Sequence, residues 1–366
     1  MGSTSTDLVL LTGGTGHLGF RVLITTLENG YSVRAVVRSE KKADIIKNNA
    51  VFKALNLGSR LSFAVVPDFV VEGAFDEAAK GVRYIIHVAS PIPTSTPADA
   101  DIDKEVVKPA VQGTQHRNAQ SANMHPSIGL LESARKAGGI TRVVVTSSVI
   151  AMLPLSAVQG VPLSATIDAE SRVPDIPGPF TDVGFAYVAS KIAALNSGER
   201  WVREQKPSFD VITIHPSIII GRDDLCDSTE YFQSGTNKYP LNVVLGLDAG
   251  VPVVPAQVNY VNDTALAHVR ALDPKVEGNQ AFILSTNGTD MQYDDAKMVA
   301  EKYFSQSVKD GILPNTGSLV SIKIPLDNSK TEKILGVKMS SYETATKTVL
   351  EHYLEMYEKE HKGQRT

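Results

Sequence analysis

The sequence lacks several features that define specialised classes of protein. Its 366 residues include a single cysteine, Cys226, which excludes an intrachain disulfide framework and a metal site built from several thiolates. No apolar stretch approaches the roughly 20 residues that a membrane-spanning helix requires. The net charge is only −4, and no long basic run indicates a surface for nucleic acid.

These absences also bear on location and metal chemistry. The first residues show no charged segment followed by an apolar core, so we expect no signal peptide, and the single cysteine favours a reducing compartment. His116 and His125 have no carboxylate or cysteine close by in the sequence, so we expect no metal site. We therefore expect a cytoplasmic protein, monomeric or homodimeric, that binds neither nucleic acid nor membrane.

The N-terminal region contains the pattern around which the chain is organised. Residues 8–11 form a short apolar run of the length of a buried parallel strand. Gly13, Gly16 and Gly19 follow, and a helical pattern then begins. A strand that passes through glycines into a helix forms a phosphate site, because backbone N–H groups and the helix dipole face the anion. The spacing G-x-x-G-x-x-G differs from the G-x-G-x-x-G fingerprint and also fits a tight turn, but its context favours a dinucleotide.

The residues after a second predicted strand, 31–37, indicate which dinucleotide binds. NAD-binding domains usually place a carboxylate there, where it binds the ribose 2′-hydroxyl. Arg38 and Lys42 follow this strand instead, and a guanidinium matches a phosphate group. We therefore expect NADP(H), with a solvated basic turn as the alternative. Asp68 follows a third predicted strand, 61–66, and either binds the adenine amino group or caps a turn.

The remaining pattern predicts alternating strands and helices. The polar residues 115–127 contain Pro126, a helix breaker, and interrupt an apolar helical face that continues in phase when they are removed. We therefore expect an insertion that loops out to solvent, or a sequence artefact. Residues 154–181 predict a long irregular loop. Other expected elements are strands at 84–88, 141–149 and 281–285, a helix that begins at 75–79, and a C-terminal helix at 342–359.

Tyr187 and Lys191 form a Tyr-x-x-x-Lys pair, which a helix presents on one face. A free phenol is a poor proton donor or acceptor at neutral pH, and a neighbouring ammonium is expected to lower its pKa. The pair therefore predicts an acid–base group for a carbonyl or an alcohol. Ser148, near the end of the strand predicted at 141–149, places a hydroxyl at the sheet edge where ligands bind. The pair alone is a weak signal, which the glycine turn and this serine strengthen.

Together these motifs resemble the extended short-chain dehydrogenases/reductases, and within them the branch that contains dihydroflavonol reductase, cinnamoyl-CoA reductase and fungal carbonyl reductases. The similarity covers most of residues 7–270. It departs from the family pattern in the segment 115–127 and at Arg222, where the family usually has proline. Cys226 and Tyr231 fall in a loop beyond this point, where they either line a pocket or pack internally. The matching stretches lie at 12–19, 33–38, 73–78, 87–91, 105–114, 146–148, 187–191 and 215–221.

The resemblance implies a role for each matching residue. Ser148 would hold the substrate carbonyl, and Tyr187 would donate the proton. Lys191 would bind the nicotinamide ribose and lower the pKa of Tyr187. Arg38 would meet the 2′-phosphate, with Lys42 as a second contact. The other cofactor-binding residues that the resemblance implies are Gly13, Thr15, Gly16, His17, Leu18, Asp68, Val88, Ala89, Ser90, Pro216 and Ser217.

The resemblance also implies a fold and an activity. The fold would be a Rossmann-like, doubly wound parallel α/β sheet with a smaller C-terminal substrate lobe. Residues 1–221 would form the NADP-binding domain around the insertion 115–127. Residues 222–366 would form mainly the lobe, with 259–286 returning to the first domain. The activity would be NADPH-dependent reduction of a small ketone or aldehyde; the alternatives are an NAD-dependent epimerase or dehydratase on the same scaffold and a non-catalytic NADP-sensing protein.

Overall fold

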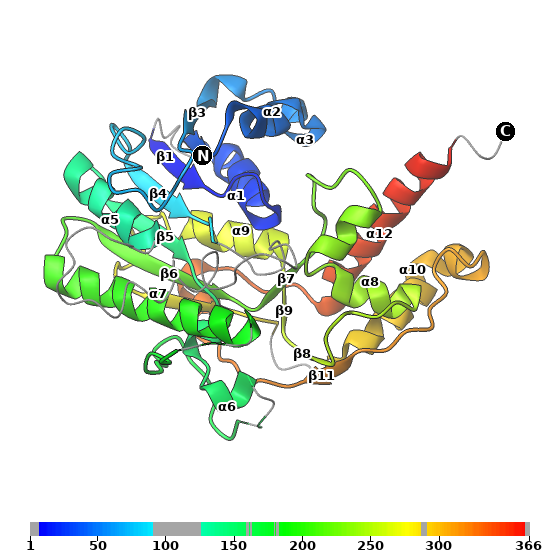
Figure 1. The fold of residues 1–366 in the computed structure, drawn as a ribbon. Helices are drawn as coiled ribbons and strands as arrows, with labels where there is room; N and C mark the ends of the chain where they lie inside the picture. Colours follow the sequence, from blue (N-terminus) through cyan, green and yellow to red (C-terminus); the bar gives the residue numbers. More distant parts are fainter. Residues whose placement is uncertain are drawn as a thin grey trace.

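The computed structural model describes residues 7–90, 126–158, 161, 163–178, 180, 183–286 and 291–362. Within this part of the chain, a seven-stranded sheet forms the centre, and every neighbouring pair of its strands is parallel (Figure 1). The predicted Rossmann-like, doubly wound α/β fold is confirmed. From one edge to the other, the strands are β10 (Ala281–Leu284), β6 (Asp210–Pro216), β5 (Arg142–Thr146), β4 (Tyr84–His87), β1 (Leu8–Thr12), β2 (Ser32–Val37) and β3 (Leu61–Val65).

The strand order reverses between β1 and β4, because the chain adds strands first on one side of β1 and then on the other. In parallel sheets the carboxyl ends of the strands meet at one edge, and ligands bind beyond that edge at the point of reversal. The turn that follows β1 contains Gly13 and Gly16, Gly19 lies in the first turn of the helix after it, and residues 88–90 follow β4 at the same edge. The predicted dinucleotide site therefore lies at the point of the sheet where ligands bind in folds of this topology.

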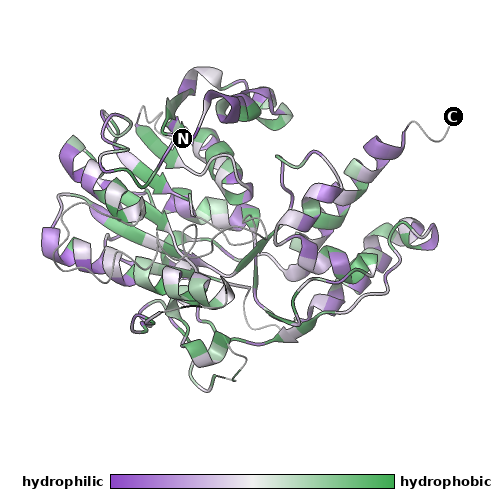
Figure 2. Cartoon of the chain, viewed as in Figure 1, coloured by the Kyte–Doolittle hydropathy of each residue, from purple (hydrophilic) through white to green (hydrophobic). Residues whose placement is uncertain are grey.

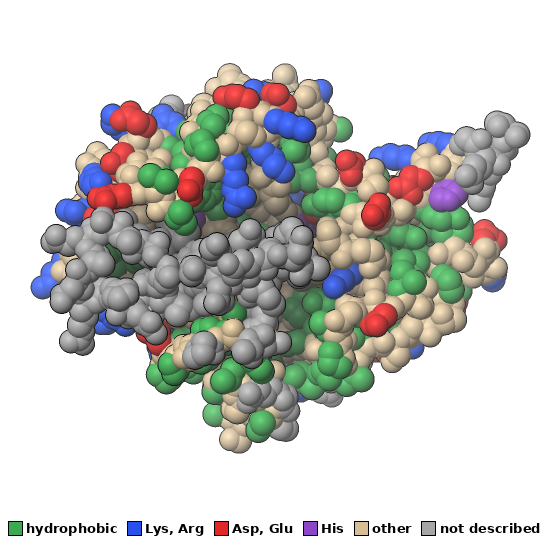
Figure 3. Space-filling model, in the orientation of Figure 1, with side chains coloured by type: hydrophobic (Ala, Val, Ile, Leu, Met, Phe, Trp, Pro, Cys, Tyr) green, Lys and Arg blue, Asp and Glu red, His purple; other side chains and the backbone are tan. Residues whose placement is uncertain are grey.

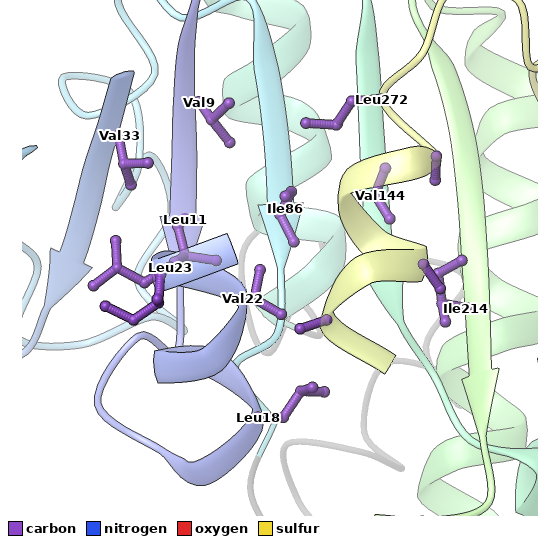
Figure 4. Close-up of a cluster of buried hydrophobic side chains, with 14 of the residues drawn as sticks. Val9, Leu11, Leu18, Val22, Leu23, Val33, Ile86, Val144, Ile214 and Leu272 are labelled. Carbon is purple, nitrogen blue, oxygen red and sulfur yellow. The ribbon is translucent and has the colours of Figure 1, made fainter. Parts of the chain in front are cut away.

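Helices cover both faces of the sheet. Val9 and Leu11 of β1 pack in a cluster with α1 (His17–Glu28) and α9 (Val261–Arg270), and Figure 4 shows these side chains between strands and helices. Leu10 points the other way, into a cluster with α5 (Pro126–Ala137) and α7 (Val183–Gln205). Strands buried on both faces require continuous apolar runs, and Figure 2 shows hydrophobic strands beneath helices with hydrophilic outer faces.

A second group of helices and short strands, which we call the lobe, lies beside the sheet, at the right of Figure 1, and has its own hydrophobic cluster. The cluster includes Leu241, Tyr293 and Val349, all fully or almost fully buried. One returning segment, α11 (Ser329–Leu335), packs instead against β10 and α9. The elements of the second group are α8 (Lys238–Leu245), α10 (Ala296–Lys309), α12 (Tyr342–His361), β7 (Ile218–Ile220) paired with β9 (Val258–Tyr260), and β8 (Val253–Pro255) paired with β11 (Val320–Ile322).

The helix predicted to begin at 75–79 is absent from the structure, which has successive turns there. Gly73 and Gly81 adopt left-handed conformations at its two ends, with φ of +71° and +70°. A right-handed helix cannot continue through either glycine in this conformation, so the helical pattern at 75–79 is not extended in either direction. Short helical segments elsewhere are α2 (Glu40–Asn48), α3 (Ala50–Leu55), α6 (Leu155–Val158), η1 (Gly58–Arg60), η4 (Val149–Met152), η5 (Glu230–Ser234) and η6 (Tyr293–Asp295).

Two other boundaries differ from the prediction. The strand predicted at 141–149 ends at Thr146, because Ser148 caps a 3₁₀ helix that follows it at once. Pro126, predicted as a breaker within a looped-out segment, instead starts α5, where the missing proline N–H costs nothing. The strand predicted at 281–285 and the helix predicted at 342–359 are confirmed to within a few residues as β10 and α12.

Other predictions fall outside the described residues, including the insertion from 115 to 125 with His116 and His125. Across the part of the chain that the structure describes, no helix has the length and apolar character needed to cross a membrane. The same residues contain no group of His, Cys, Asp and Glu side chains that could hold a metal ion.

Candidate active site

The turn between β1 and α1 has the geometry of a phosphate-binding turn. Gly13 has a left-handed φ of +81°, and a Cβ there would lie 2.7 Å from the backbone nitrogen of Ala89. A Cβ on Gly19 would overlap the carbonyl oxygen of Gly13, so α1 approaches the turn more closely than any other residue allows. Gly16 is exposed at the N-cap of α1 and has no side chain to occupy the first N–H groups. These N–H groups are therefore open to an anion.

Basic side chains follow β2 at the same edge of the sheet. Arg38 is exposed, and its guanidinium carbon lies 5.8 Å from the ring centroid of Phe69, which supports it from one side. Lys42 is exposed on α2, and Figure 3 shows Lys and Arg side chains gathered over this part of the molecule. Asp68 accepts a hydrogen bond from the N–H of Val70 (3.0 Å), so its carboxylate caps a turn.

Ser148 lies just beyond β5, at the same edge. The pairing of β5 with β6 extends to Ser147, whose N–H donates to the carbonyl oxygen of Ile214 (2.7 Å). Ser148 is extended, with φ −158° and ψ 152°, and its Oγ accepts a hydrogen bond from the N–H of Ile150 (3.3 Å). The 3₁₀ helix η4 that it caps packs against α7, which carries Tyr187. The fold thus brings the serine's strand end against the tyrosine's helix.

Lys191 is buried on α7, one turn after Tyr187. Its Nζ lies 5.6 Å from the centroid of the tyrosine ring. The ammonium donates a hydrogen bond to Oγ of Ser90 (2.9 Å), which follows β4. This bond ties α7 to the strand next to the glycine turn, and a lysine ammonium has two further N–H donors for a ligand.

The pKa values of this pair differ from the sequence prediction. Burial raises the pKa of Tyr187 to about 12, with a smaller contribution from the phenol of Tyr239. Burial lowers the pKa of Lys191 to about 8. The sequence predicts a lowered pKa for Tyr187, and in this structure the direction is the opposite one, because desolvation disfavours the phenolate. At neutral pH Tyr187 therefore holds its proton and is a hydrogen-bond donor.

Replacing Lys191 by methionine is expected to stabilise the cofactor-free protein. Burial lowers the lysine pKa from 10.5 to about 8, which destabilises the fold by up to about 3 kcal/mol at neutral pH. The cost is fully present below pH 8 and disappears as the pH rises towards 10.5, since the unfolded chain binds the extra proton in that window. Urea unfolding at pH 7 and pH 10 measures the effect: the gain should be larger at pH 7. A gain in stability over the unmodified protein that is smaller at pH 7 than at pH 10 would contradict this prediction.

A buried asparagine supports the end of β6. Both the N–H and the hydroxyl of Ser217 donate to Oδ1 of Asn259, at 2.7 Å each. Asn259 is fully buried on β9. No sequence motif marks its role, because its partner lies 42 positions away and only the folded chain joins them.

Tyr239 is a second residue near the site that no sequence motif predicts. It lies half-buried in the first turn of α8, with its ring edge-on to Tyr293 at 5.9 Å between centroids. Its phenol contributes to the raised pKa of Tyr187, so this residue of the lobe lies near the Tyr187–Lys191 pair. A lone tyrosine in a short helix has no motif that marks it in advance.

The chain is similar to known proteins along most of its length, although no family model matches it. A ketoreductase, CTB6 of Cercospora nicotianae, is 39% identical over 97% of this chain and 97% of its own length. The chain belongs to the extended short-chain dehydrogenase/reductase family. ALT6 of Alternaria alternata, an NAD-dependent epimerase/dehydratase, is 32% identical over 91% of this chain and 93% of its own. The solved yeast methylglyoxal/isovaleraldehyde reductase Gre2, complexed with NADPH, shares the fold with a TM-score of 0.74 and 21% identity over 96% of this chain and 99% of its own.

In this short-chain dehydrogenase/reductase, Arg222 takes the place of the usual proline and forms ion pairs. Its guanidinium donates two hydrogen bonds to Glu355 of α12, at 2.8 Å each, and a third to Asp224 (3.0 Å). Asp224 is almost fully buried and also pairs with Arg21 of α1. The arginine thus joins the lobe's last helix to the helix of the glycine turn.

The lone cysteine of this short-chain dehydrogenase/reductase packs internally. Cys226 lies in the lobe cluster, its Sγ donates to the carbonyl oxygen of Ser228 (3.2 Å), and burial raises its pKa to about 12. Such a thiol stays protonated and does not act as a nucleophile. Tyr231 nearby is 37% exposed.

Proposed function

We propose that this protein is an NADPH-dependent carbonyl reductase that acts on a small ketone or aldehyde. The observation that carries the proposal is the half-buried, protonated phenol of Tyr187, one helical turn from the ammonium of Lys191. The same sheet edge carries Ser148 and the glycine turn. A protonated phenol suits reduction, which ends in transfer of a proton to an alkoxide. The name of the ketoreductase relative supports the same class of reaction.

The chain's own groups would act on the substrate oxygen. When bound, NADPH supplies a hydride to the carbonyl carbon. The Tyr187 hydroxyl donates its proton to the oxygen as negative charge develops there, and the Ser148 hydroxyl donates a hydrogen bond to the same oxygen. Oγ of Ser148 already accepts from the N–H of Ile150, so its own proton is available to the substrate. Lys191 favours the phenolate left by proton transfer and offers the nicotinamide ribose the donors that Ser90 does not use.

The residues at this edge fit NADP(H). The open N-terminus of α1 suits a pyrophosphate, and Arg38 lies where an NAD-binding domain places a carboxylate. Ser217 is held by Asn259 beside the end of β6, where the nicotinamide would lie. The cofactor-binding residues that we propose are Gly13, Thr15, Gly16, His17, Leu18, Arg38, Lys42, Asp68, Val88, Ala89, Ser90, Tyr187, Lys191, Pro216 and Ser217.

Replacing Arg38 by alanine is expected to raise the dissociation constant for NADPH about 10–100-fold, because a charge-assisted hydrogen bond to the 2′-phosphate is lost. The constant for NADH should change little, since NADH has no such phosphate. Fluorescence titration with both cofactors measures the difference. Lys47→Ala is the matched control, because Lys47 is another exposed cation beside an aromatic ring, that of Phe63 at 5.1 Å. Equal weakening of NADPH binding and NADH binding in Arg38→Ala would contradict a contact with the 2′-phosphate.

A second candidate is an NAD-dependent epimerase or dehydratase, which the name of the ALT6 relative favours. The basic residue after β2 argues against NAD. Such an enzyme retains its cofactor, so release of NAD from the purified, denatured protein would support it. A non-catalytic NADP-sensing protein is a third candidate; it would bind NADPH without turnover, and the presence of Ser148, Tyr187 and Lys191 argues against it.

We also propose that the two parts of the fold, the central sheet with its helices and the second group of elements beside it, have two different roles. Residues 1–221 and 259–286 would bind the cofactor, and the rest of 222–366 would mainly contact the substrate. The pairing of β10 with β6 and the packing of α9 against α1 support the return of 259–286 to the sheet. Packing of α11 against β10 adds a second returning segment.

A carbonyl panel tests the function directly. The protein is mixed with NADPH and with aryl ketones, β-keto esters and aldehydes in turn, and the loss of NADPH absorbance is followed. We expect turnover with at least one member and a preference for NADPH over NADH. Absence of turnover across the panel with either cofactor would overturn the proposed activity, and a preference for NADH would overturn the cofactor assignment.

A further inference from the structure

We propose that His215 is a positioning residue for Ser148, and that it holds the hydroxyl of this serine in the orientation that carbonyl reduction requires. The inference rests on the proposed function, since that function gives Ser148 its hydrogen bond to the substrate. His215 lies on β6, the neighbour of β5 in the sheet, and is completely buried. It does not touch the reacting atoms itself, and acts through the peptide of Ser148.

The two ring nitrogens of His215 have separate partners. Nδ1 lies 3.1 Å from the carbonyl oxygen of Ser148, and Nε2 lies 3.0 Å from Oγ1 of Thr213. A carbonyl oxygen can only accept, so Nδ1 carries the hydrogen and donates it. In the neutral ring Nε2 then accepts from the hydroxyl of Thr213. Both nitrogens of a buried ring are thus satisfied, and any rotation of the ring breaks both hydrogen bonds.

This contact extends the link between the two strands by one residue. The main-chain pairing ends where the N–H of Ser147 donates to the carbonyl oxygen of Ile214 (2.7 Å). The next carbonyl, that of Ser148, is held by the His215 side chain instead. It also accepts from the N–H of Ala151 (3.0 Å), so the peptide plane is fixed from two sides.

A fixed peptide at this point orients the serine side chain. Oγ of Ser148 accepts from the N–H of Ile150, which leaves the hydroxyl proton as the group that can be donated outward. Burial lowers the pKa of His215 to about 4, with contributions from the positive charges of Arg172 and Lys191. The ring therefore stays neutral at physiological pH and keeps the tautomer that donates to Ser148.

Two substitutions separate the hydrogen bond from the bulk of the ring. His215→Leu removes the donor at similar volume, and His215→Asn keeps a nitrogen donor at the same number of bonds from Cβ as Nδ1. We expect His215→Leu to lower kcat about 10–100-fold, because a displaced oxyanion donor loses most of its effect. KM and the NADPH dissociation constant should change little. His215→Asn should restore kcat to within a few-fold of the unmodified protein.

A double-mutant cycle shows whether the effect passes through Ser148. In a Ser148→Ala background, His215→Leu should cost no further activity, since the hydroxyl that it positions is gone. The matched control is His268→Leu: His268 is also fully buried and bonds a main-chain carbonyl and a threonine, but it does not contact Ser148. It should lower the unfolding temperature and leave kcat within a few-fold. Rates are measured with the panel member that the protein reduces fastest.

The outcomes distinguish this inference from the proposed function. If the unmodified protein reduces carbonyls and His215→Leu does so at the same kcat, the inference fails and the function stands. The inference also fails if His215→Leu lowers activity equally with and without Ser148, or if NADPH binding is lost, because the histidine then has a general structural role. If the unmodified protein reduces no carbonyl, both fail together.

Discussion

Tyr187→Phe is expected to reduce kcat for carbonyl reduction by about 10²–10⁴-fold, the contribution typical of a general acid. The phenol is half-buried, and desolvation raises its pKa to about 12. At neutral pH it is therefore protonated and can donate its proton. Phenylalanine keeps the ring that lies 5.6 Å from the ammonium of Lys191, so packing and NADPH binding should be retained. Rates of NADPH oxidation measure the loss of carbonyl reduction, and fluorescence titration of NADPH measures whether cofactor binding is retained.

Tyr239→Phe is the matched control, because it removes the other phenol near this position and leaves the Tyr187–Lys191 pair intact. It should change KM more than kcat, since the residue lies on the lobe and not at the strand ends. Unchanged kcat in Tyr187→Phe would end the assignment of this tyrosine as the proton donor and, with it, the proposed mechanism.

Gly19→Ala is expected to lower the free energy of unfolding by about 1–3 kcal/mol and to weaken NADPH binding severely. Alanine is ordinarily the better helix former, by about 0.5–1 kcal/mol. At this position its Cβ would overlap the carbonyl oxygen of Gly13 and lie 3.1 Å from the nitrogen of Gly14, both backbone atoms of the phosphate turn. The turn must move to accommodate it, at a cost typical of overpacking. Urea unfolding and NADPH titration measure the two effects.

Gly198→Ala provides the comparison. Gly198 lies inside α7, and a Cβ there would meet no atom within 4 Å. The same chemical change should therefore stabilise the protein by about 0.5–1 kcal/mol and leave NADPH binding unaltered. Similar stability and cofactor binding in the two variants would contradict the steric role of Gly19.

The sheet was accessible from the sequence because its strands are buried on both faces. Runs such as residues 8–11 and 84–88 have to be apolar throughout, and the glycines after the first run have no ordinary role in a helix start. The Tyr187–Lys191 spacing was equally accessible, because a helix places positions four apart on one face. Such features depend on neighbouring residues alone.

What the sequence could not supply depends on contacts made only after folding. The pKa of Tyr187 rises because of burial, which tertiary packing decides. The contacts of His215 with Ser148 and of Asn259 with Ser217 join positions 67 and 42 residues apart. The helix predicted at 75–79 does not form for a different reason: the glycines at both ends of this segment adopt left-handed conformations, through which a right-handed helix cannot continue.

The parallel arrangement of the central sheet has a consequence for how activity is acquired. The groups of the site come from the ends of β1, β4, β5 and β6 and from α7, and parallel neighbours can meet only after a long crossover has been placed. Loop-closure entropy makes such pairing slow relative to helix formation. During refolding, helical circular dichroism should therefore recover before enzymatic turnover, and a fragment that stops short of β6 should have no residual turnover at all.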